Sequence, residues 1–263
     1  MISRLRNPAR DRLEAGETAL GVGIVQGRTV DIAGMMKTSG YDWIFLDLEH
    51  GALSLETASQ MAVAALAVGI SPICRIPIGG YGLASRILDC GALGIVMPHC
   101  ETPEEAGRLV DTALFPPAGH RGIGGAIPQF NYEAVNLGEA VVELNRAMLL
   151  TVMVETPEAV ARADEIAAVE GIDVVMIGTN DLALALGHPQ EFGHPEVVEA
   201  YQTVAAACRR HGKWLGSGGV RVPELAQDYI AMGARFFLAG QDIGFMMAAA
   251  RERANILRQA ATG

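Results

Sequence analysis

Apolar runs of strand length recur along the chain, and each is followed by a segment in which apolar residues have helical spacing. Short runs that are apolar throughout are typical of parallel strands buried on both faces. Eight such β and α units in 263 residues favour a (β/α)8 barrel, in one domain over residues 1–263, rather than a doubly wound open sheet. The runs are ALGVGIV (19–25), WIFLDL (43–48), SPICRI (71–76), LGIVMP (93–98), MLLTVMV (148–154), DVVMIG (173–178), KWLGSG (213–218) and ARFFLAG (234–240).

A glutamate stands at the end of the fifth run. Residues 148–154 predict a buried strand, while Thr156 as N-cap and Pro157 at the first helical position predict the start of a new helix. Glu155 lies between the two elements, so we expect it at the carboxyl end of the strand. The alternative interpretation is an ordinary solvated loop residue.

The segment after the fourth run combines a clear helix with a long loop. Residues 103–115 predict an amphipathic helix, with Thr102 as N-cap and Glu105 at the capping-box position. Residues 116–132 are rich in Gly and Pro, and loops of this length are usually functional or disordered. The glycines at 122–125 do not follow a strand, which argues against a dinucleotide fingerprint. We therefore predict a mobile lid.

Composition and charge narrow the choice of partners. Half of the residues are hydrophobic and 19% are charged, and 20 Lys+Arg against 30 Asp+Glu give a net charge of -10. No Lys/Arg-rich run is present, which argues against nucleic-acid binding. No apolar h-region follows the N-terminal residues, and no apolar stretch approaches membrane-spanning length. We expect a cytoplasmic protein that binds neither nucleic acid nor a membrane.

The cysteines give no sign of a disulfide or a zinc cluster. Cys74, Cys90, Cys100 and Cys208 form no C-x-x-C pair and lie within or beside apolar runs. This placement is typical of reduced, mostly buried thiols.

Ionisable residues gather at the ends of the predicted strands. In a (β/α)8 barrel the chemistry lies at the carboxyl ends of the strands, so these side chains are expected to share one rim. Each also has a structural interpretation: Asn180 or Asp181 could cap a helix, Arg75 could form a structural ion pair, and His50 could be a packed histidine. The rim residues are Asp47, Glu49, His50, Arg75, His99, Glu155 and Asp181.

Two carboxylates from adjacent strands, without a Cys or His cluster, are typical of a hard oxygen-ligand site that suits Mg²⁺ or Mn²⁺. An arginine beside such a metal can stabilise a developing oxyanion, and a histidine can move a proton. These groups are suited to forming an enolate from a 2-oxo acid. A lysine Schiff base is the main alternative chemistry. The only two lysines argue against it, because Lys37 falls in a helix and Lys213 starts a strand, away from the predicted rim.

Several segments, in order, resemble one family. They are FLDLEHG, the arginine in ICRIP, ILDCGALGIVMP, FPPAGHRGIGG, VETPEA, and IGTNDLA followed by HPEV, within roughly residues 15–250. The chain resembles the class II, metal-dependent pyruvate aldolases of the HpcH/HpaI family, which are related to the citrate lyase β subunit.

The resemblance implies roles for specific residues. Glu155 and Asp181 would be the metal ligands, with oxygens of pyruvate and water completing the shell around Mg²⁺, Mn²⁺ or Co²⁺. Arg75 would hold the keto or enolate oxygen, and His50 would be the acid and base. The family pairs this histidine with an aspartate that matches Asp89. Because Asp89 falls near the end of the third helix, at the opposite face of its barrel, we expect that contact to come from a neighbouring subunit.

The resemblance also implies a carboxylate site and marks a departure from the family. Backbone amides of Gly178, Thr179, Asn180 and Asp181 would receive the pyruvate carboxylate at a helix N-terminus. Many members have a glutamine two residues before the metal glutamate, where this chain has Met153. This change removes a polar group beside the metal site.

The assembly implied by the resemblance is a homo-oligomer, usually a hexamer built as a trimer of dimers, in which the eighth helix swaps between subunits. The apolar, methionine-containing segment 242–250 fits a helix that buries one face on a partner. It fits equally well a helix docked on its own barrel.

The leading function is reversible retro-aldol cleavage of a 4-hydroxy-2-oxo acid to pyruvate and an aldehyde through a metal-bound pyruvate enolate. The alternatives are a CoA-thioester lyase or a decarboxylase on the same scaffold, and a non-catalytic metal and 2-oxo acid binder, suggested by Met153. An acidic semialdehyde would require a cation near the outer site. Arg121 in the predicted lid is a candidate, and the alternative is an arginine that pairs within the loop.

Overall fold

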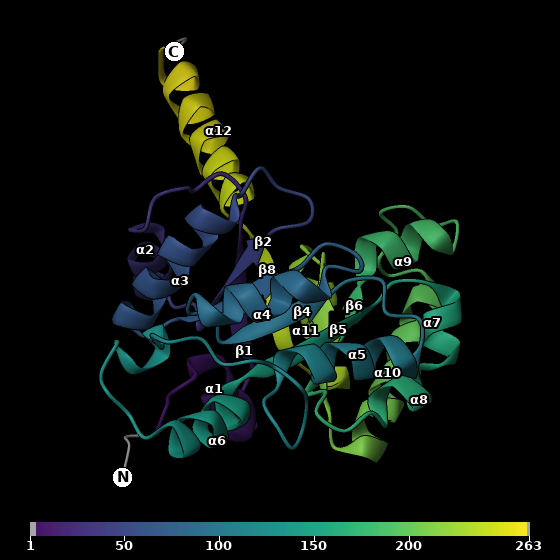
Figure 1. Ribbon diagram of the computed structural model, residues 1–263. Coiled ribbons are helices and arrows are strands. Elements are labelled where there is room, and N and C mark those ends of the chain that lie inside the picture. Colours follow the sequence, from purple (N-terminus) through teal and green to yellow (C-terminus); the bar gives the residue numbers. More distant parts are fainter. Residues whose placement is uncertain (1–3, 262–263) are drawn as a thin grey trace.

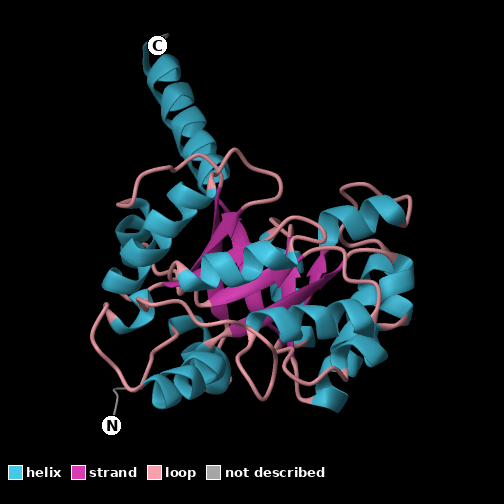
Figure 2. Cartoon of the chain, in the orientation of Figure 1, coloured by secondary structure: helices cyan, strands magenta, loops and turns pink. Residues whose placement is uncertain are grey.

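Eight parallel strands close into a barrel in the computed structural model, which describes residues 4–261. Each strand pairs with the next in sequence, and β8 pairs with β1 (Figure 1). The helices lie around the strands, as Figure 2 shows in cyan and magenta. The fold is therefore the predicted (β/α)8 barrel. The strands are β1 (Ala19–Ile24), β2 (Trp43–Asp47), β3 (Ser71–Arg75), β4 (Gly94–Met97), β5 (Leu149–Val154), β6 (Val174–Gly178), β7 (Trp214–Gly218) and β8 (Ala234–Gln241).

Every predicted strand is present, with ends within one residue of the predicted ones. The predicted capping box at Thr102 and Glu105 is also confirmed. The short helix before β1 was not predicted from the sequence. The helices are α1 (Pro8–Glu14), α2 (Ile32–Thr38), α3 (Leu55–Val68), α4 (Tyr81–Asp89), α5 (Pro103–Ala113), α6 (Leu137–Ala147), α7 (Pro157–Ala161), α8 (Ala163–Ala167), α9 (Thr179–Ala185), α10 (Pro195–His211), α11 (Pro223–Met232) and α12 (Asp242–Ala261), with a 3₁₀ turn η1 (Pro128–Phe130).

Alternate strand residues fill the interior of the barrel. Leu149 and Met153 of β5 belong to this inner cluster, together with Trp43 and Phe236, whose rings stack at 4.0 Å. The helix α1 adds Ala9 and Leu13 to the same cluster. It therefore closes the end of the barrel at which the strands begin.

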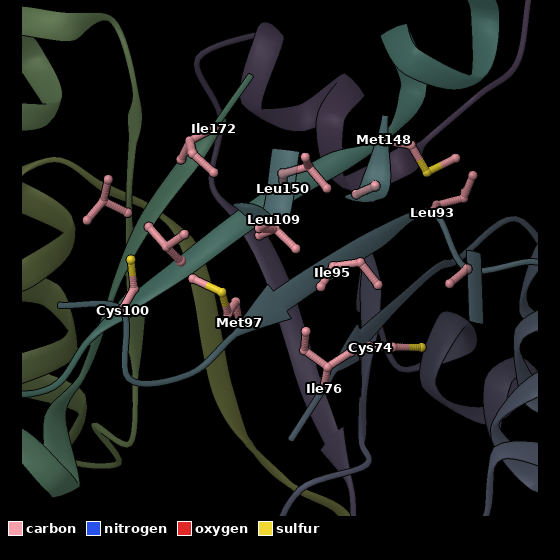
Figure 3. Packing of buried hydrophobic residues seen from close by; sticks show 14 of the residues in the cluster. Cys74, Ile76, Leu93, Ile95, Met97, Cys100, Leu109, Met148, Leu150 and Ile172 are labelled. Carbon is pink, nitrogen blue, oxygen red and sulfur yellow. The ribbon is translucent and has the colours of Figure 1, made fainter. Parts of the chain in front are cut away.

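The intervening residues face outward and pack against the helices. Ile95 and Met97 of β4 and Leu150 of β5 are buried in this outer layer with Leu109 of α5 (Figure 3). Because both faces of each strand are buried, the strand sequences are apolar at nearly every position.

The last helix leaves this arrangement. Figure 1 shows α12 extending away from the barrel, with the C-terminus at its far end. Its base is held by Asp242, whose carboxylate accepts hydrogen bonds from the backbone N–H groups of Val25, Gln26 and Gly27 after β1. None of the helices within residues 4–261 has the length and apolar character needed to span a membrane.

We predict that Gly21→Ala destabilises the barrel. A Cβ at Gly21 would lie 2.0 Å from the indole ring of Trp43, which is completely buried and cannot move aside. Overpacking of this kind typically costs roughly 3 kcal/mol of unfolding free energy, measurable by urea denaturation.

Gly34→Ala is the matched control, because a Cβ at this position of α2 meets nothing within 4 Å. Helix propensity should make this change neutral or stabilising by up to about 1 kcal/mol. Equal stability of the two variants would contradict the packing argument.

Candidate active site

On three strands, the alternate residues that face the barrel interior end in ionisable side chains at the carboxyl-end rim. On β5 the inward positions 149, 151 and 153 lead to Glu155, and on β2 and β3 they end at Asp47 and Arg75. A cavity of about 440 Å³ opens beside Asp47 and Arg75, and Glu155 lies next to it without lining it, behind Gly178 of the wall. The cavity is lined by Val25, Phe45, Asp47, His50, Arg75, Met153, Met176, Gly178, Asn180, Asp181, Gly218, Gly219, Val220, Arg221, Leu238, Gly240 and Gln241.

Glu155 is buried, with 2% of its surface exposed, and its carboxylate is held from one side. The Oε2 atom accepts a 2.7 Å hydrogen bond from the backbone N–H of His99, and Oε1 has no hydrogen bond within the described part of the chain. Gly178 makes room for this carboxylate, since a Cβ there would lie 2.3 Å from Oε1. Thr156 caps α7 as predicted, which turns the chain away directly after Glu155.

Asp181 brings a second carboxylate to this place from the first turn of α9. Burial raises the pKa of Glu155 above its ordinary value, and the negative charge of Asp181 adds to the rise. A divalent cation fits beside these two carboxylates, because it would relieve the repulsion that Asp181 exerts on the Glu155 carboxylate. Oxygen donors of this kind suit Mg²⁺ or Mn²⁺.

Arg75 is held by a bidentate ion pair with Asp47. Its Nε donates to Oδ1 at 3.0 Å and its Nη2 to Oδ2 at 2.5 Å, and Nη1 lies 3.3 Å from Glu49. Burial by itself would raise the pKa of Asp47, but the guanidinium and two backbone donors lower it below its usual range. Arg75 thus forms the structural ion pair considered above and also lines the cavity.

His50 lies at the mouth of the cavity, with 61% of its side chain exposed. Its backbone N–H donates to Asp47 Oδ1 at 3.2 Å, and the N–H of Glu49 donates to the same atom at 3.0 Å. The imidazole Nε2 lies 3.8 Å from the Glu49 carboxylate. Neither oxygen of Glu49 has a hydrogen-bond partner within residues 4–261, although both are buried.

Sequence reasoning assigned no role to Asp47 and Glu49, although they connect Arg75 with His50. A signal was present, because Asp47 and Arg75 are both inward positions at strand ends and are register partners in adjacent strands. A buried arginine that directly faces a carboxylate across two strands predicts an ion pair.

The residues expected to bind the pyruvate carboxylate surround the start of α9. Gly178, Asn180 and Asp181 line the cavity. The side chain of Thr179 has another partner, because its hydroxyl lies 2.7 Å from the buried hydroxyl of Tyr201. Thr179 can therefore offer the cavity only its backbone.

Asp89 is not brought to the cavity of its own chain. It ends α4, at the opposite face of the barrel, and its carboxylate accepts a 2.7 Å hydrogen bond from Arg121. Arg121 is buried and paired with Asp89 of α4, so within the single chain it serves neither the outer site nor a pair inside its own loop, the two roles left open by the sequence. The geometry explains this outcome: the guanidinium turns toward α4 and lies over the ring of Phe115.

The segment predicted to be a lid does not lie at the cavity. No residue of the 116–132 loop lines the cavity, and Gln129 anchors the loop by donating to the carbonyl oxygens of Leu88 and Ala92. Within one chain the loop therefore packs along the end of α4 instead of covering the site.

Comparison with known proteins identifies the family. The family model described as HpcH/HpaI aldolase/citrate lyase matches residues 24–249. The chain belongs to this family. It is 37% identical over 238 residues to the 4-hydroxy-4-methyl-2-oxoglutarate aldolase tasA of Hapsidospora irregularis, covering 89% of this chain and 87% of the relative.

Two further similarities cover nearly the whole chain. The 2-keto-3-deoxy-L-rhamnonate aldolase of Escherichia coli K12 is 34% identical over 245 residues, covering 92% of this chain and 90% of the relative. The crystal structure of an HpcH/HpaI aldolase from Desulfitobacterium hafniense DCB-2 superposes with a TM-score of 0.90 at 28% identity, covering 95% of this chain and 96% of the other. The protein is a carbon–carbon lyase of the aldolase type.

Neither lysine lines the cavity of this aldolase. Lys37 lines a different pocket with Asp42 and Arg12, and the Nζ of Lys213 donates to the carbonyl oxygens of Val169 and Ile172. No lysine amine is therefore placed at the cavity to form a Schiff base.

Methionines form part of the cavity wall. Met153 is the inward residue directly before Glu155 on β5, and it faces Met176 in the register of β5 and β6. Both line the cavity, so the wall beneath the carboxylates is apolar where the resemblance leads one to expect a glutamine.

A group of potential metal ligands lies outside the cavity. Ligand atoms of His188, His194 and Glu196, between α9 and α10, lie within 4.8 Å of one another. The Nδ1 atom of His194 accepts a hydrogen bond from the backbone N–H of Glu196, so this imidazole already caps α10. A cation there would also face the positive end of the helix dipole.

We predict that Asp47→Ala destabilises the aldolase by about 3 kcal/mol, because it leaves the buried Arg75 guanidinium without its bidentate partner. Denaturant unfolding of the purified variant measures the loss. Glu165→Ala, which removes the exposed ion pair with Arg162, is the control and should cost less than about 1 kcal/mol. Equal costs would show that the Asp47 pair is no stronger than a surface pair.

Proposed function

We propose that this aldolase is a metal-dependent class II enzyme that cleaves 4-hydroxy-2-oxo acids reversibly to pyruvate and an aldehyde. The observation that carries the proposal is the pair of carboxylates, Glu155 and Asp181, close enough for one charge to raise the pKa of the other group. Asp181, Arg75 and His50 line one cavity, and Glu155 lies against Gly178 of its wall. Family membership supports the reaction class.

Glu155 and Asp181 would hold Mg²⁺ or Mn²⁺, with Co²⁺ as a further candidate. When bound, the cation would supply positive charge that polarises the keto group of the substrate. The carboxylate of the pyruvate moiety would accept hydrogen bonds from backbone amides at residues 178–181.

The protein residues then account for the bond changes. His50, acting through a water molecule, removes the proton from the 4-hydroxyl group. The released electron pair forms the aldehyde carbonyl as the C3–C4 bond breaks, and the C3–C4 electrons form the enolate of pyruvate. Arg75 donates hydrogen bonds to the enolate oxygen. The proton that His50 took from the 4-hydroxyl group is then returned, through water, to C3 and gives pyruvate.

The positions of these groups depend on their neighbours. Asp47 holds Arg75 from the barrel side, and it also accepts the backbone N–H of His50. We further propose that Asp89 contacts His50 of a neighbouring subunit, in keeping with its distance from the cavity of its own chain.

We predict that the enzyme exchanges the methyl protons of pyruvate with D₂O only when Mg²⁺ or Mn²⁺ is present, because exchange requires the enolate but no aldehyde. NMR follows the exchange after EDTA treatment and again after metal is added back. Glu155→Gln keeps the shape of the side chain and removes its charge, so exchange should fall at least about a hundredfold.

The control for this experiment is Glu104→Gln, which changes an exposed carboxylate in the first turn of α5 that does not line the cavity. It should exchange pyruvate protons at the wild-type rate. Absence of exchange by folded wild-type enzyme with either metal would contradict the proposed function. Full exchange in the presence of EDTA would contradict its metal dependence.

We also propose that the enzyme is a homo-oligomer in which α12 packs on another subunit. The base of the helix is tied to its own barrel through Asp242 and the stacking of Phe245 on Tyr41. Beyond the base, α12 exposes the large apolar side chains Met246, Met247, Ile256 and Leu257. An exposed apolar helix face of this kind marks an interaction site, and the resemblance described above implies a hexamer.

We predict a solution mass of six times the 27.7 kDa of one chain, measured by light scattering after size exclusion. Ile256→Glu with Leu257→Glu should dissociate the oligomer, because charges at a buried interface are costly. The control is Val142→Glu, which changes an equally exposed apolar residue on α6. A monomeric wild-type protein would contradict the proposal.

A further inference from the structure

Three buried hydroxyl groups meet next to the start of α9. The hydroxyl of Tyr201, on α10, lies 2.7 Å from the hydroxyl of Thr179 and 2.7 Å from the hydroxyl of Ser217. Thr179 is the first residue of α9, Ser217 lies on β7, and all three residues are completely buried. Tyr201 therefore connects the first turn of α9 to a strand of the barrel from the helix layer outside it.

We propose that Tyr201 is a positioning residue, which fixes the first turn of α9 through Thr179 and thereby sets the place of the Asp181 carboxylate. Tyr201 does not line the cavity, so it acts only through its neighbours. The inference rests on the proposed function and adds to it a residue on which the metal affinity depends.

The start of α9 is not held by a side-chain cap. Its N-cap residue is Gly178, and no side chain caps the helix there. A capping side chain is the usual means of fixing a helix start. Here the hydroxyl bond of Thr179 ties the first residue of the helix to the barrel, and Asp181 follows two residues later in the same turn. A displacement of Thr179 therefore displaces Asp181.

The close packing around this turn makes its position important. A Cβ at Gly178 would lie 2.3 Å from Oε1 of Glu155, so the turn is in close contact with the other carboxylate. A Cβ at Gly219, after β7, would lie 2.6 Å from the side-chain nitrogen of Asn180. A shift of the turn changes the separation of the two carboxylates, and a bound cation requires its ligands within about 0.5 Å of their productive positions.

The Tyr201 hydroxyl is itself held in a fixed place. Its ring stacks on that of Tyr229 of α11, with the centroids 3.7 Å apart and the planes 12° from parallel. Burial raises the pKa of Tyr201 above its ordinary value, so the phenol keeps its proton. It can then donate to one of the two neighbouring hydroxyls and accept from the other. Replacement by phenylalanine removes the partner that Thr179 and Ser217 share.

The test measures Mn²⁺ binding by isothermal titration calorimetry, which requires no turnover. For Tyr201→Phe and for Thr179→Val, which removes the other hydroxyl of the bond, we expect the Kd for Mn²⁺ to rise about tenfold. Thr179→Ser keeps a hydroxyl and should recover most of the affinity that Thr179→Val loses. Saturating Mn²⁺ should restore most of the pyruvate exchange rate of Tyr201→Phe, because the phenol touches no reacting atom.

Tyr229→Phe is the matched control. It makes the same substitution in the same stacked pair, but the Tyr229 hydroxyl donates to the carbonyl oxygen of Phe192 instead of to α9. This variant should lose stability in denaturant unfolding and keep the wild-type Kd for Mn²⁺. An equal rise of the Kd in Tyr229→Phe would overturn the positioning role, because the effect would then follow from general destabilisation. If Tyr201→Phe does not fold, Thr179→Val and Thr179→Ser test the same bond from its other end.

Metal binding by the wild type separates this inference from the proposed function. Metal-dependent exchange in the wild type, with an unchanged Kd in the variants that lack the Tyr201 or the Thr179 hydroxyl, would overturn the role of Tyr201 and leave the aldolase proposal intact. Absence of Mn²⁺ and Mg²⁺ binding to folded wild-type enzyme would overturn both.

Discussion

Closure of eight parallel strands forces every second side chain toward one axis, and the candidate site depends on this constraint. Below the rim, the inward positions are filled by apolar residues such as Leu149, Phe236 and Trp43. At the strand ends the same alternation delivers charged groups, because Glu155 continues the inward series of β5 and Arg75 ends that of β3. The packing of the barrel interior and the position of the charged site residues therefore both follow from the alternation of side chains along the strands.

The rim gathers more negative than positive charge, and this imbalance shapes its chemistry. Asp47 and Glu49 both contact Arg75. These contacts hold the guanidinium in place, and the two carboxylates balance its positive charge. Neither Glu155 nor Asp181 forms an ion pair with an arginine or lysine within residues 4–261, and the burial of Glu155 makes its negative charge costly. A cation from solution is the simplest way to satisfy this pair, and that requirement links the electrostatics of the rim to the metal dependence proposed above.

Several features of the single chain are explained more readily if the protein forms an oligomer. The helix α12 leaves the barrel after its first turn and exposes apolar side chains along its length. Asp89 and Arg121 form an ion pair at the opposite face of the barrel from the cavity, and the loop that carries Arg121 does not cover the site. Residues that lack a role in one chain can acquire one from a neighbouring subunit, as we propose for Asp89.

The sequence by itself determined the eight strands, the caps at Thr102 and Thr156, and the place of Glu155 at a strand end. These features are local, since they depend on periodicity and on hydrogen bonds between residues a few positions apart. Only the tertiary structure decided which charged groups meet. It paired Asp47 with Arg75, turned Arg121 toward Asp89 and left Arg221 on the cavity wall. A side chain's partner depends on strand register and on the path of distant loops, and no local pattern specifies the direction in which a long loop carries its arginine.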